Sequence, residues 1–413
     1  MSKLKELIDR LCPNGVPFKQ LNELAALSRG KVYSKEYLRD NAGGYPVYSS
    51  QTANDGVLGM INTYDYDGEY LTWTTDGAYA GTIFHRKGCF SITNVCGLIT
   101  LTSSEIILRF LYYWLSIEAP KHVYSGMGNP KLMSNQVAPI LVPVPPIEVQ
   151  EEIVKILDTF SAHAAELQAE LQARKEQYEY YRNLLLSFNP SACGCGTDGE
   201  QGMKDITTWG GHSYKITWKT MGEICNKTKN IKWKDNPTKE CLYIDLSSVD
   251  CETHGFSNQL TMINAKTAPS RAQQIVETND VLFGTTRPTL MRFAIVPQKL
   301  NNNICSTGYA VLRANSEIVL PQFLYFILNT HRFYSFVENN QEGAGYPSIS
   351  FSKLQSFSIP VPPIELQEKI VAILDRFETL VNDLTQGLPA EIAAVKEQYE
   401  YYRNKLLTFK QIA

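Results

Sequence analysis

The sequence has no long apolar run. No stretch approaches the roughly 20 apolar residues that a membrane-spanning helix needs, and the first ten residues, MSKLKELIDR, mix charged and apolar side chains. A secretory signal would instead contain an uninterrupted apolar segment near its start. We therefore expect neither a membrane anchor nor export, and we place the protein in the cytoplasm.

Closely spaced cysteines are almost absent. Of nine cysteines, only Cys193 and Cys195 stand close together, in the glycine-rich stretch ACGCGTDGEQG. A structural zinc site needs a second pair at suitable spacing. We interpret the cysteines as reduced thiols and residues 190–214 as a flexible linker. Cys96, in SITNVCG, has no histidine linked to it by a motif, and we expect it in the core.

Catalytic motifs are missing as well. An adenine methyltransferase needs an Asn/Asp-Pro-Pro-aromatic motif, and GNPKL at residues 128–132 offers only Asn-Pro before a lysine. No phosphate-binding G-x-x-x-x-G-K-[ST] loop occurs, no Pro-Asp dipeptide opens a PD-(D/E)xK nuclease core, and the six histidines lack metal-ligand spacing. An enzyme with its own active site is therefore not supported, and we expect no catalytic residue, metal or cofactor in this chain.

The sequence does contain a long internal repeat. A chain of 413 residues exceeds the size of one hydrophobic core, so two or more domains are expected. The nonapeptide KEQYEYYRN occurs at 175–183 and again at 396–404, an offset of 221. Upstream of it, PVPPIEVQEEIVKILDTF (143–160) matches PVPPIELQEKIVAILDRF (360–377) at an offset of 217. The second copy therefore has four additional residues between the two blocks.

Residues 148–189 and 365–413 each carry apolar side chains in alternating steps of four and three, the seam pattern of a coiled coil. We predict two helices of about 40 residues, on the order of 60 Å long. The second has an additional step of four from Leu388 to Ile392, a stutter, and we expect a kink or break there because Gly387 and Pro389 are adjacent. The predicted seam and partner-docking residues are Leu157, Phe160, Leu167, Leu171, Tyr178, Tyr181, Leu374, Phe377, Leu384, Leu388, Tyr399 and Tyr402.

The simplest way to bury both seams is to pack the two helices on each other within the chain. Self-association of two chains is the competing arrangement, since a seam pattern specifies pairing but not the partner. The sequence leaves both arrangements open.

The segments before the helices also correspond, through short β-type blocks. EYLTWTT (69–75) matches DVLFGTT (280–286) and VCGLITL (95–101) matches STGYAVL (306–312), both at an offset of 211, while GNPKL (128–132) matches GYPSI (345–349). We predict an α+β chain with an internal pseudo-two-fold repeat of two mixed α/β globules. Its parts are globule 1 with a short N-terminal helix (1–147), helix (148–189), linker (190–214), globule 2 (215–364) and helix (365–413).

The net charge of −3 argues at first against nucleic acid, but the charge is unevenly distributed. The two globules are slightly basic, with 13 basic and 12 acidic groups in 1–147 and 16 and 14 in 190–364. The acidic excess lies in the two predicted helices, with 4 basic and 8 acidic groups in 148–189 and 6 and 8 in 365–413. The globules therefore remain candidates for binding DNA.

Globule 2 contains the strongest basic cluster, seven lysines between 215 and 239 that face only two acidic residues and are interleaved with Trp218 and Trp233. Lysine clusters contribute affinity for phosphates rather than choice of sequence. The cluster predicts docking on a DNA backbone, with a solvated surface loop as the alternative. The lysines singled out are Lys227, Lys229, Lys232 and Lys234.

Loops that follow predicted strands carry side chains able to read base edges. Arginine suits guanine and amide side chains suit adenine, although each such residue is also an ordinary turn residue. In globule 1 the candidates are Ser49, Ser50, Gln51, Asn54, Thr74, Thr75, Asp76, Tyr79, Asn129 and Lys131. In globule 2 they are Thr285, Thr286, Arg287, Arg292, Ser306 and Tyr346.

The duplicated block of PVPPIE, a long helix and YEYYR, spanning essentially the whole chain as two copies, resembles the specificity subunit of type I restriction-modification systems. The resemblance implies two target recognition domains, each reading one half of a split DNA site, and two conserved helices packed as an antiparallel coiled coil that sets the gap between the halves.

The same resemblance implies partners. They are double-stranded DNA, two modification subunits that use S-adenosylmethionine to methylate adenine, and two restriction subunits that use ATP and magnesium. This chain would be the non-catalytic specificity subunit. The competing hypothesis is a coiled-coil scaffold that assembles other proteins without reading bases, which leaves the differing globules and the lysine cluster unexplained.

Overall fold

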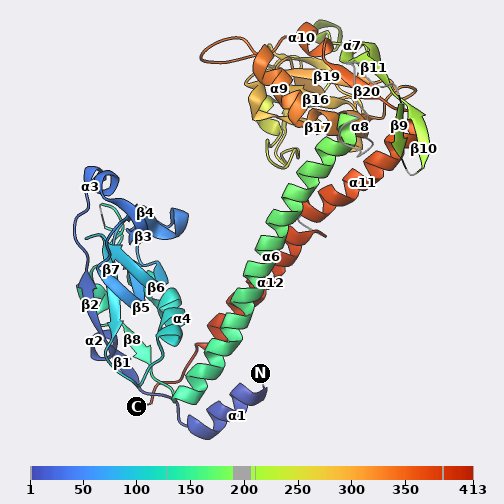
Figure 1. Cartoon of the computed structure of the whole chain (residues 1–413). Coiled ribbons are helices and arrows are strands. Elements are labelled where there is room, and N and C mark those ends of the chain that lie inside the picture. Colours follow the sequence, from blue (N-terminus) through green and yellow to red (C-terminus); the bar gives the residue numbers. More distant parts are fainter. Residues whose placement is uncertain (1, 127, 189–205, 210, 384–385, 413) are drawn as a thin grey trace. The chain divides into compact units, whose positions relative to one another are not determined.

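A computed structural model of the chain describes residues 2–126, 128–188, 206–209, 211–383 and 386–412. Contacts divide the chain into two compact units, unit 1 (residues 1–166 and 392–413) and unit 2 (residues 167–391). Each unit therefore combines one globule with the first part of the helix that follows it and the last part of the other long helical segment (Figure 1). Among the described residues, every helix is too short or too polar to cross a lipid bilayer.

Unit 1 is built on a six-stranded sheet of order β2-β7-β5-β6-β3-β4, in which only β3 and β6 are parallel. Helix α4 packs on β5 and β6, and a two-stranded sheet joins β1 to β8. The elements are α1 (Ser2–Leu11), β1 (Phe18–Gln20), α2 (Leu21–Leu24), β2 (Ala25–Arg29), α3 (Lys35–Asp40), β3 (Ala42–Tyr48), η1 (Ala53–Gly56), β4 (Val57–Ile61), β5 (Tyr66–Thr74), β6 (Ile83–Ile92), β7 (Cys96–Leu101), α4 (Leu108–Glu118), η2 (Ala119–His122), α5 (Ser134–Val137), β8 (Leu141–Pro143) and the first part of α6 (Ile147–Ser187).

Unit 2 has two four-stranded sheets, β12-β19-β16-β17 and β14-β13-β18-β15, with helix α8 against β16, β17 and β19. The elements are β9 (Ile206–Trp209), β10 (His212–Lys215), β11 (Thr217–Thr220), α7 (Met221–Ile224), β12 (Cys225–Asn226), η4 (Trp233–Asp235), β13 (Cys241–Ile244), η5 (Leu246–Ser248), β14 (Thr261–Ile263), β15 (Ala272–Ile275), β16 (Val281–Gly284), η6 (Pro288–Leu290), β17 (Phe293–Ile295), η7 (Gln298–Leu300), β18 (Ile304–Ser306), β19 (Tyr309–Ala314), α8 (Pro321–Leu328), α9 (His331–Asn340), α10 (Phe351–Gln355), β20 (Ser358–Val361) and α11 (Ile364–Asn382).

The hairpin of β9 and β10, except for its last residue Lys215, falls inside the stretch predicted as a linker. Residues 190–205 of that stretch, including Cys193 and Cys195, lie outside the described residues. The domain boundaries drawn from the sequence stay predictions.

The strand ladders show the repeat in three dimensions and correct its alignment, by one residue in the first block and by two in the second. In β5–β7, Trp73 faces Gly97, and in β16–β19, Phe283 faces Ala310. Trp73 and Phe283 are both fully buried. The offset of 211 had instead matched Trp73 with Gly284. Because strand side chains alternate between faces, a slip of one residue would move the core residue to the other side of the sheet.

Thr75 and Thr285, which directly follow β5 and β16, confirm the corrected register. The Thr75 hydroxyl donates to the carbonyl of Val95 at 2.8 Å, and the Thr285 hydroxyl donates to the carbonyl of Gly308 at 2.8 Å. Thr75 therefore corresponds to Thr285, 210 residues later, and not to Thr286. The two units share a backbone frame that the sequence blocks located only approximately.

Helix α6 packs on the later helices through aromatic stacks. In unit 1, Phe160 stacks on Tyr402 of α12 (Leu388–Leu406), with ring centroids 5.4 Å apart. In unit 2, Tyr178 and Tyr181 stack on Phe377 of α11 at 6.3 and 5.9 Å. As α6 advances from 160 to 181, its partner residues go back from 402 to 377, so the segments run antiparallel. The seams are thus buried within the chain.

Most predicted seam residues are buried or half-buried. Leu157, Leu167, Leu171, Tyr178, Leu374 and Leu388 are buried, and Phe160, Phe377, Tyr399 and Tyr402 are half-buried. Tyr181 is 37% exposed although it stacks on Phe377. Position 384 lies outside the described residues.

The second long helical segment is two helices and not one. Helix α11 ends at Asn382 and α12 begins at Leu388, so the expected kink or break is a break. A Cβ at Gly387 would stand 2.4 Å from the carbonyl oxygen of Thr379, and Pro389 lies in the first turn of α12, where it leaves no helical hydrogen bond unmade. The break lies directly before the stutter from Leu388 to Ile392.

A buried glutamine anchors each globule to its helix. Gln150, in the first turn of α6, and Gln367, in the first turn of α11, are both fully buried. The Gln150 side chain accepts from the Ile107 backbone N–H at 2.8 Å and donates to the carbonyls of Glu105 and Pro145 at 2.8 and 2.7 Å. Gln367 makes the same three bonds, with Leu320 as donor and Ile318 and Pro362 as acceptors.

Replacing Gln150 by leucine removes all three bonds and leaves the buried Pro145 carbonyl and the half-buried Ile107 N–H without this partner. We expect Gln150→Leu to lower the free energy of unfolding by about 2–4 kcal/mol, since each orphaned buried group costs about 1–3 kcal/mol. Urea denaturation followed by circular dichroism measures it. The control is Gln172→Leu, an exposed glutamine of α6 bonded only to Glu176, for which a change below about 0.5 kcal/mol is expected. Equal midpoints for the two variants would contradict the anchor.

Candidate nucleic-acid interface

Two loops of unit 1 meet beyond the end of β5. The backbone of Asp76 bridges that of Lys131, and Lys131 in turn bridges Tyr124. The Leu132 N–H donates to the carbonyl of Thr75 at 2.8 Å. The segments WTTDG and GNPKL, matched separately in the sequence, are therefore one hydrogen-bonded structure.

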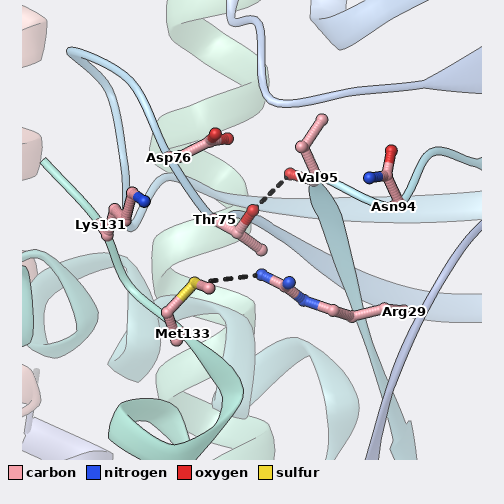
Figure 2. Close-up of a pocket in the computed structure, with 7 residues that line it drawn as sticks. All are labelled: Arg29, Thr75, Asp76, Asn94, Val95, Lys131 and Met133. Carbon is pink, nitrogen blue, oxygen red and sulfur yellow. Dashed lines mark hydrogen bonds between the residues drawn. The ribbon is translucent and has the colours of Figure 1, made fainter. Parts of the chain in front are cut away.

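A hollow of about 90 Å³ opens between these loops, the end of β2 and the β6–β7 turn. Its lining residues are Arg29, Thr75, Asp76, Asn94, Val95, Lys131 and Met133. Figure 2 shows Asp76 and Lys131 on one side of the hollow and Arg29 and Asn94 on the other, with Thr75 between them. The Arg29 guanidinium donates to the sulfur of Met133 at 3.4 Å. Three of the predicted residues, Thr75, Asp76 and Lys131, thus line one site.

Several hydroxyl groups predicted to read DNA instead stabilise the backbone of this site. We call the hydrogen-bonded backbone that joins the two loops the frame. Thr74 and Thr75 are 1% exposed. The Thr74 hydroxyl accepts the Thr82 N–H at 3.0 Å, and Ser50 accepts the Thr75 N–H at 3.1 Å while donating to Val95. These hydroxyls are therefore occupied within the protein, and we correct their role to that of supports.

The other candidates of unit 1 divide in the same way. Ser49 accepts a hydrogen bond from Thr93 at 3.1 Å, and Gln51 donates to the carbonyl of Val57. Asn54, in the left-handed backbone region at φ 50°, and Asn129 are exposed, and Tyr79 is 64% exposed. The exposed three remain available to a ligand.

Unit 2 repeats the frame with different side chains. The backbone of Thr286 bridges Ser348, and the Ile349 N–H donates to Thr285 at 2.9 Å. Arg287, at φ 48°, donates its N–H to Pro347 at 2.7 Å. Its exposed guanidinium lies 4.5 Å from the ring centroid of Tyr346, which is 73% exposed.

Two other candidates of unit 2 point into the protein. Arg292 donates to the carbonyls of Val249 and Leu246 at 2.8 and 3.3 Å. Ser306 is fully buried and accepts the Gly308 N–H at 3.2 Å. The expected base contact by Ser306 is therefore corrected to a structural role, because its side chain is fully buried. Arg292 is half-buried, and its Nη1 atom bonds to carbonyls inside the fold, which gives it a structural role as well.

The lysine cluster lies on the surface of unit 2. Lys227, Lys229, Lys232 and Lys234 are exposed, and none forms an ion pair within the described part of the chain. Trp233, which is interleaved with these lysines in the sequence, packs against the core and donates to the carbonyl of Ala272 at 2.7 Å. The alternation of lysine and tryptophan reflects outward and inward positions.

Cys96 lies in the core of unit 1. Burial raises the pKa of the Cys96 thiol to about 12, so it stays neutral, and its side chain belongs to the core as expected. Among the described residues, no three or more His, Cys, Asp or Glu side chains are grouped so as to hold a metal ion.

Sequence reasoning missed Arg29, Asn94 and Met133 at the hollow, and the two anchoring glutamines. Arg29 is the last residue of β2 and Asn94 lies in the tight turn between β6 and β7. The available signal was a polar residue directly at a strand end. That signal is common, and only the packing of β2 beside β7 brings these positions to the loop after β5.

The contrasting placement of two arginines in unit 2 is testable by stability. Arg292→Ala should lower the free energy of unfolding by about 1.5–3 kcal/mol, because it removes a charged donor from the carbonyls of Val249 and Leu246. The Leu246 carbonyl keeps the Tyr309 hydroxyl as a donor. Arg287→Ala should cost less than about 1 kcal/mol, since it removes only an exposed cation–π contact. Thermal denaturation measures both changes. Equal losses would show that Arg292 is not part of the internal structure.

His254 generates a pH dependence in the same loop that Arg292 holds. The ring stacks on Phe293 at 3.8 Å, and burial, followed by the nearby charge of Arg182, lowers its pKa to about 4, with Asp250 opposing. The unfolded chain binds the proton near its ordinary pKa of about 6.5. Stability is therefore complete above that pH and falls as the pH drops towards about 4.

We expect protonation of His254 to lower the free energy of unfolding by about 2 kcal/mol when the pH falls from 7 to 5. His254→Asn removes the titration, and asparagine tolerates the left-handed backbone at φ 54°. Free energies of unfolding of both proteins at both pH values measure the effect, because all other titrating groups are shared. Parallel losses in the two proteins would refute the assignment.

Comparisons with known proteins were made on the whole chain. The family described as "Type I restriction modification DNA specificity domain" matches residues 13–176 and 215–394. A putative type I specificity subunit of Mycoplasma pneumoniae is 31% identical over 392 residues, covering 94% of this chain and 96% of that protein. The type I restriction enzyme MpnII specificity subunit of the same organism is 40% identical over 190 residues, covering 45% of this chain and 57% of its own length.

Two solved structures share the fold over almost the whole chain. The S subunit of a type I restriction-modification system from M. genitalium has a TM-score of 0.56 at 15% identity, covering 95% of this chain and 96% of that one. A chain from a type I restriction-modification system solved for its assembly has a TM-score of 0.55 at 16% identity, covering 96% and 98%. At this identity the likeness concerns the fold alone.

Proposed function

Because the chain belongs to the family of type I restriction-modification specificity subunits, we propose that it reads a split DNA site, one half by the interface of each unit. The observation that carries this proposal is the repeated frame. Thr75 with Leu132 and Thr285 with Ile349 make the same backbone bonds, while the exposed side chains around them differ. One frame with two sets of side chains suits two half-sites of different sequence.

The chemistry of the exposed groups supports direct reading of bases. Lys131 and Arg287 are exposed and Asp76 is half-buried, and all three stand in the loops joined by these backbone bonds. Arginine can make two hydrogen bonds to guanine in the major groove, and a carboxylate accepts from cytosine. The unpaired lysines from 227 to 234 would bind phosphates and fix the position of unit 2 on the duplex.

The duplicated nonapeptide supports two equivalent docking sites. Tyr180 and Tyr401 occupy the same place in the two copies and are 63% and 58% exposed. Exposed tyrosines are frequent anchors in protein interfaces. We propose that each copy binds one modification subunit.

Catalysis would then lie in those partners. The modification subunits would supply adenine methylation with S-adenosylmethionine, and two restriction subunits would supply ATP- and magnesium-dependent cleavage, in the cytoplasm where the DNA is. This chain would contribute recognition only.

Exchanging one recognition region tests the proposal. Coexpression of the chain with a modification subunit, followed by mapping of methylated adenines in the host genome, should show one bipartite site. Replacing residues 215–355 by the equivalent region of another family member should change one half of that site and leave the other half intact. The exchange of residues 18–143 is the reciprocal control and should change only the other half.

Binding to a duplex with the mapped site should also weaken steeply with salt, since each phosphate contact releases counterions. A continuous target, a change of both halves in a single exchange, or an active complex without any sequence preference would overturn the proposal. The last outcome would favour a coiled-coil scaffold that does not read bases.

A further inference from the structure

We propose that the hollow of unit 1 is the base-reading centre for the first half-site, with Arg29 and Asn94 as its specificity-determining residues. This inference rests on the proposed function and names the side chains that carry it. Both residues lie at strand ends and both line the hollow (Figure 2).

Arg29 has the chemistry of a guanine reader. Its side chain is exposed, and its single hydrogen bond within the described residues goes to the sulfur of Met133, a weak acceptor. The remaining guanidinium donors are free, and no carboxylate pairs with them in the described part of the chain. A planar fork of this kind matches the two acceptors O6 and N7 of guanine.

Asn94 carries an amide that complements the guanidinium of Arg29 at the same hollow. It lies in the turn between β6 and β7, and its backbone N–H donates to the carbonyl of Lys31 at 3.1 Å. Its side chain is exposed and makes no hydrogen bond to a described residue. An asparagine amide can donate to N7 and accept from N6 of adenine.

The support beneath these side chains is rigid. The Val95 carbonyl accepts from the hydroxyls of Ser50 and Thr75 and from the Thr75 N–H. These bonds hold the turn that carries Asn94 against the loop that carries Asp76. Fixed support of this kind lowers the ordering cost of binding and sharpens selectivity.

The corresponding positions of unit 2 have different side chains. Counting back from the facing pairs Trp73–Gly97 and Phe283–Ala310, Asn94 corresponds to Thr307, and the shared bridges match Asp76 with Thr286 and Lys131 with Ser348. The frame is retained while the polar groups at its rim change. This is the pattern expected of positions that choose bases and not of positions that hold the fold.

The polar side chains of Arg29, Asn94 and Lys131 line the hollow. From there they can bond to the edges of stacked base pairs in the major groove.

The test uses the full chain in complex with its modification subunits. Methylated adenines are mapped in the host genome for the wild type, Arg29→Ala and Asn94→Ala. Each variant should lose about tenfold to a hundredfold discrimination at one base pair of the half-site read by unit 1. The spacing and the other half-site should not change. Arg29→Lys keeps the charge but not the planar fork of donors. It should therefore weaken the preference at the same base pair.

The control is Arg39→Ala, an exposed arginine of unit 1 on α3 that pairs with Asp40 at 2.9 Å and lies outside the hollow. It should leave both half-sites unchanged. If the wild type shows a bipartite site and the Arg29 and Asn94 variants methylate the same sites with the same preference, this inference is wrong while the proposed function stands. If the wild type shows no bipartite site, the proposed function fails. A variant that fails to assemble is replaced by Arg29→Gln or Asn94→Ser, judged by the same criteria.

Discussion

The aromatic stacks between the two copies of the repeat are the contacts on which the arrangement of each unit depends. Phe160 of the first copy stacks on Tyr402 of the second, and Phe377 of the second stacks on Tyr181 of the first. Each phenylalanine thus meets a tyrosine of the other copy's nonapeptide. This reciprocity explains why the same nine residues are needed twice, since an interface between two like elements requires the same surface on both.

The anchoring glutamines extend this constraint from the helices to the globules. Gln150 and Gln367 bond the first turn of a helix to the segment that precedes the globule's own helix, α4 or α8. The stacks orient the helices and the glutamines orient each sheet on its helix. Loops such as those at Asp76 and Arg287 can then differ in sequence without disturbing the frame, because their backbone bonds carry the structure and their side chains do not.

The helices were predictable because a heptad seam is a local pattern that repeats over many residues. The break before Leu388 was also visible, since Gly387 and Pro389 have physical effects on a helix wherever they occur. The site was predicted less well. Thr75, Asp76 and Lys131 lie together at one hollow. Arg292 and Ser306 were chosen by residue type and by their place in the sequence pattern, and neither shows whether a side chain faces the solvent or the sheet.

By itself, the sequence determined the duplication, the two helical seams, the strand-rich globules and the family, because each of these is written in residues near one another or in two similar blocks. The tertiary structure decided which residues share a surface. It set the strand register that pairs Thr75 with Thr285, turned Arg292 inward, and brought Arg29 and Asn94 to one hollow. Register and strand order depend on contacts between segments far apart in the chain, and no local pattern encodes them.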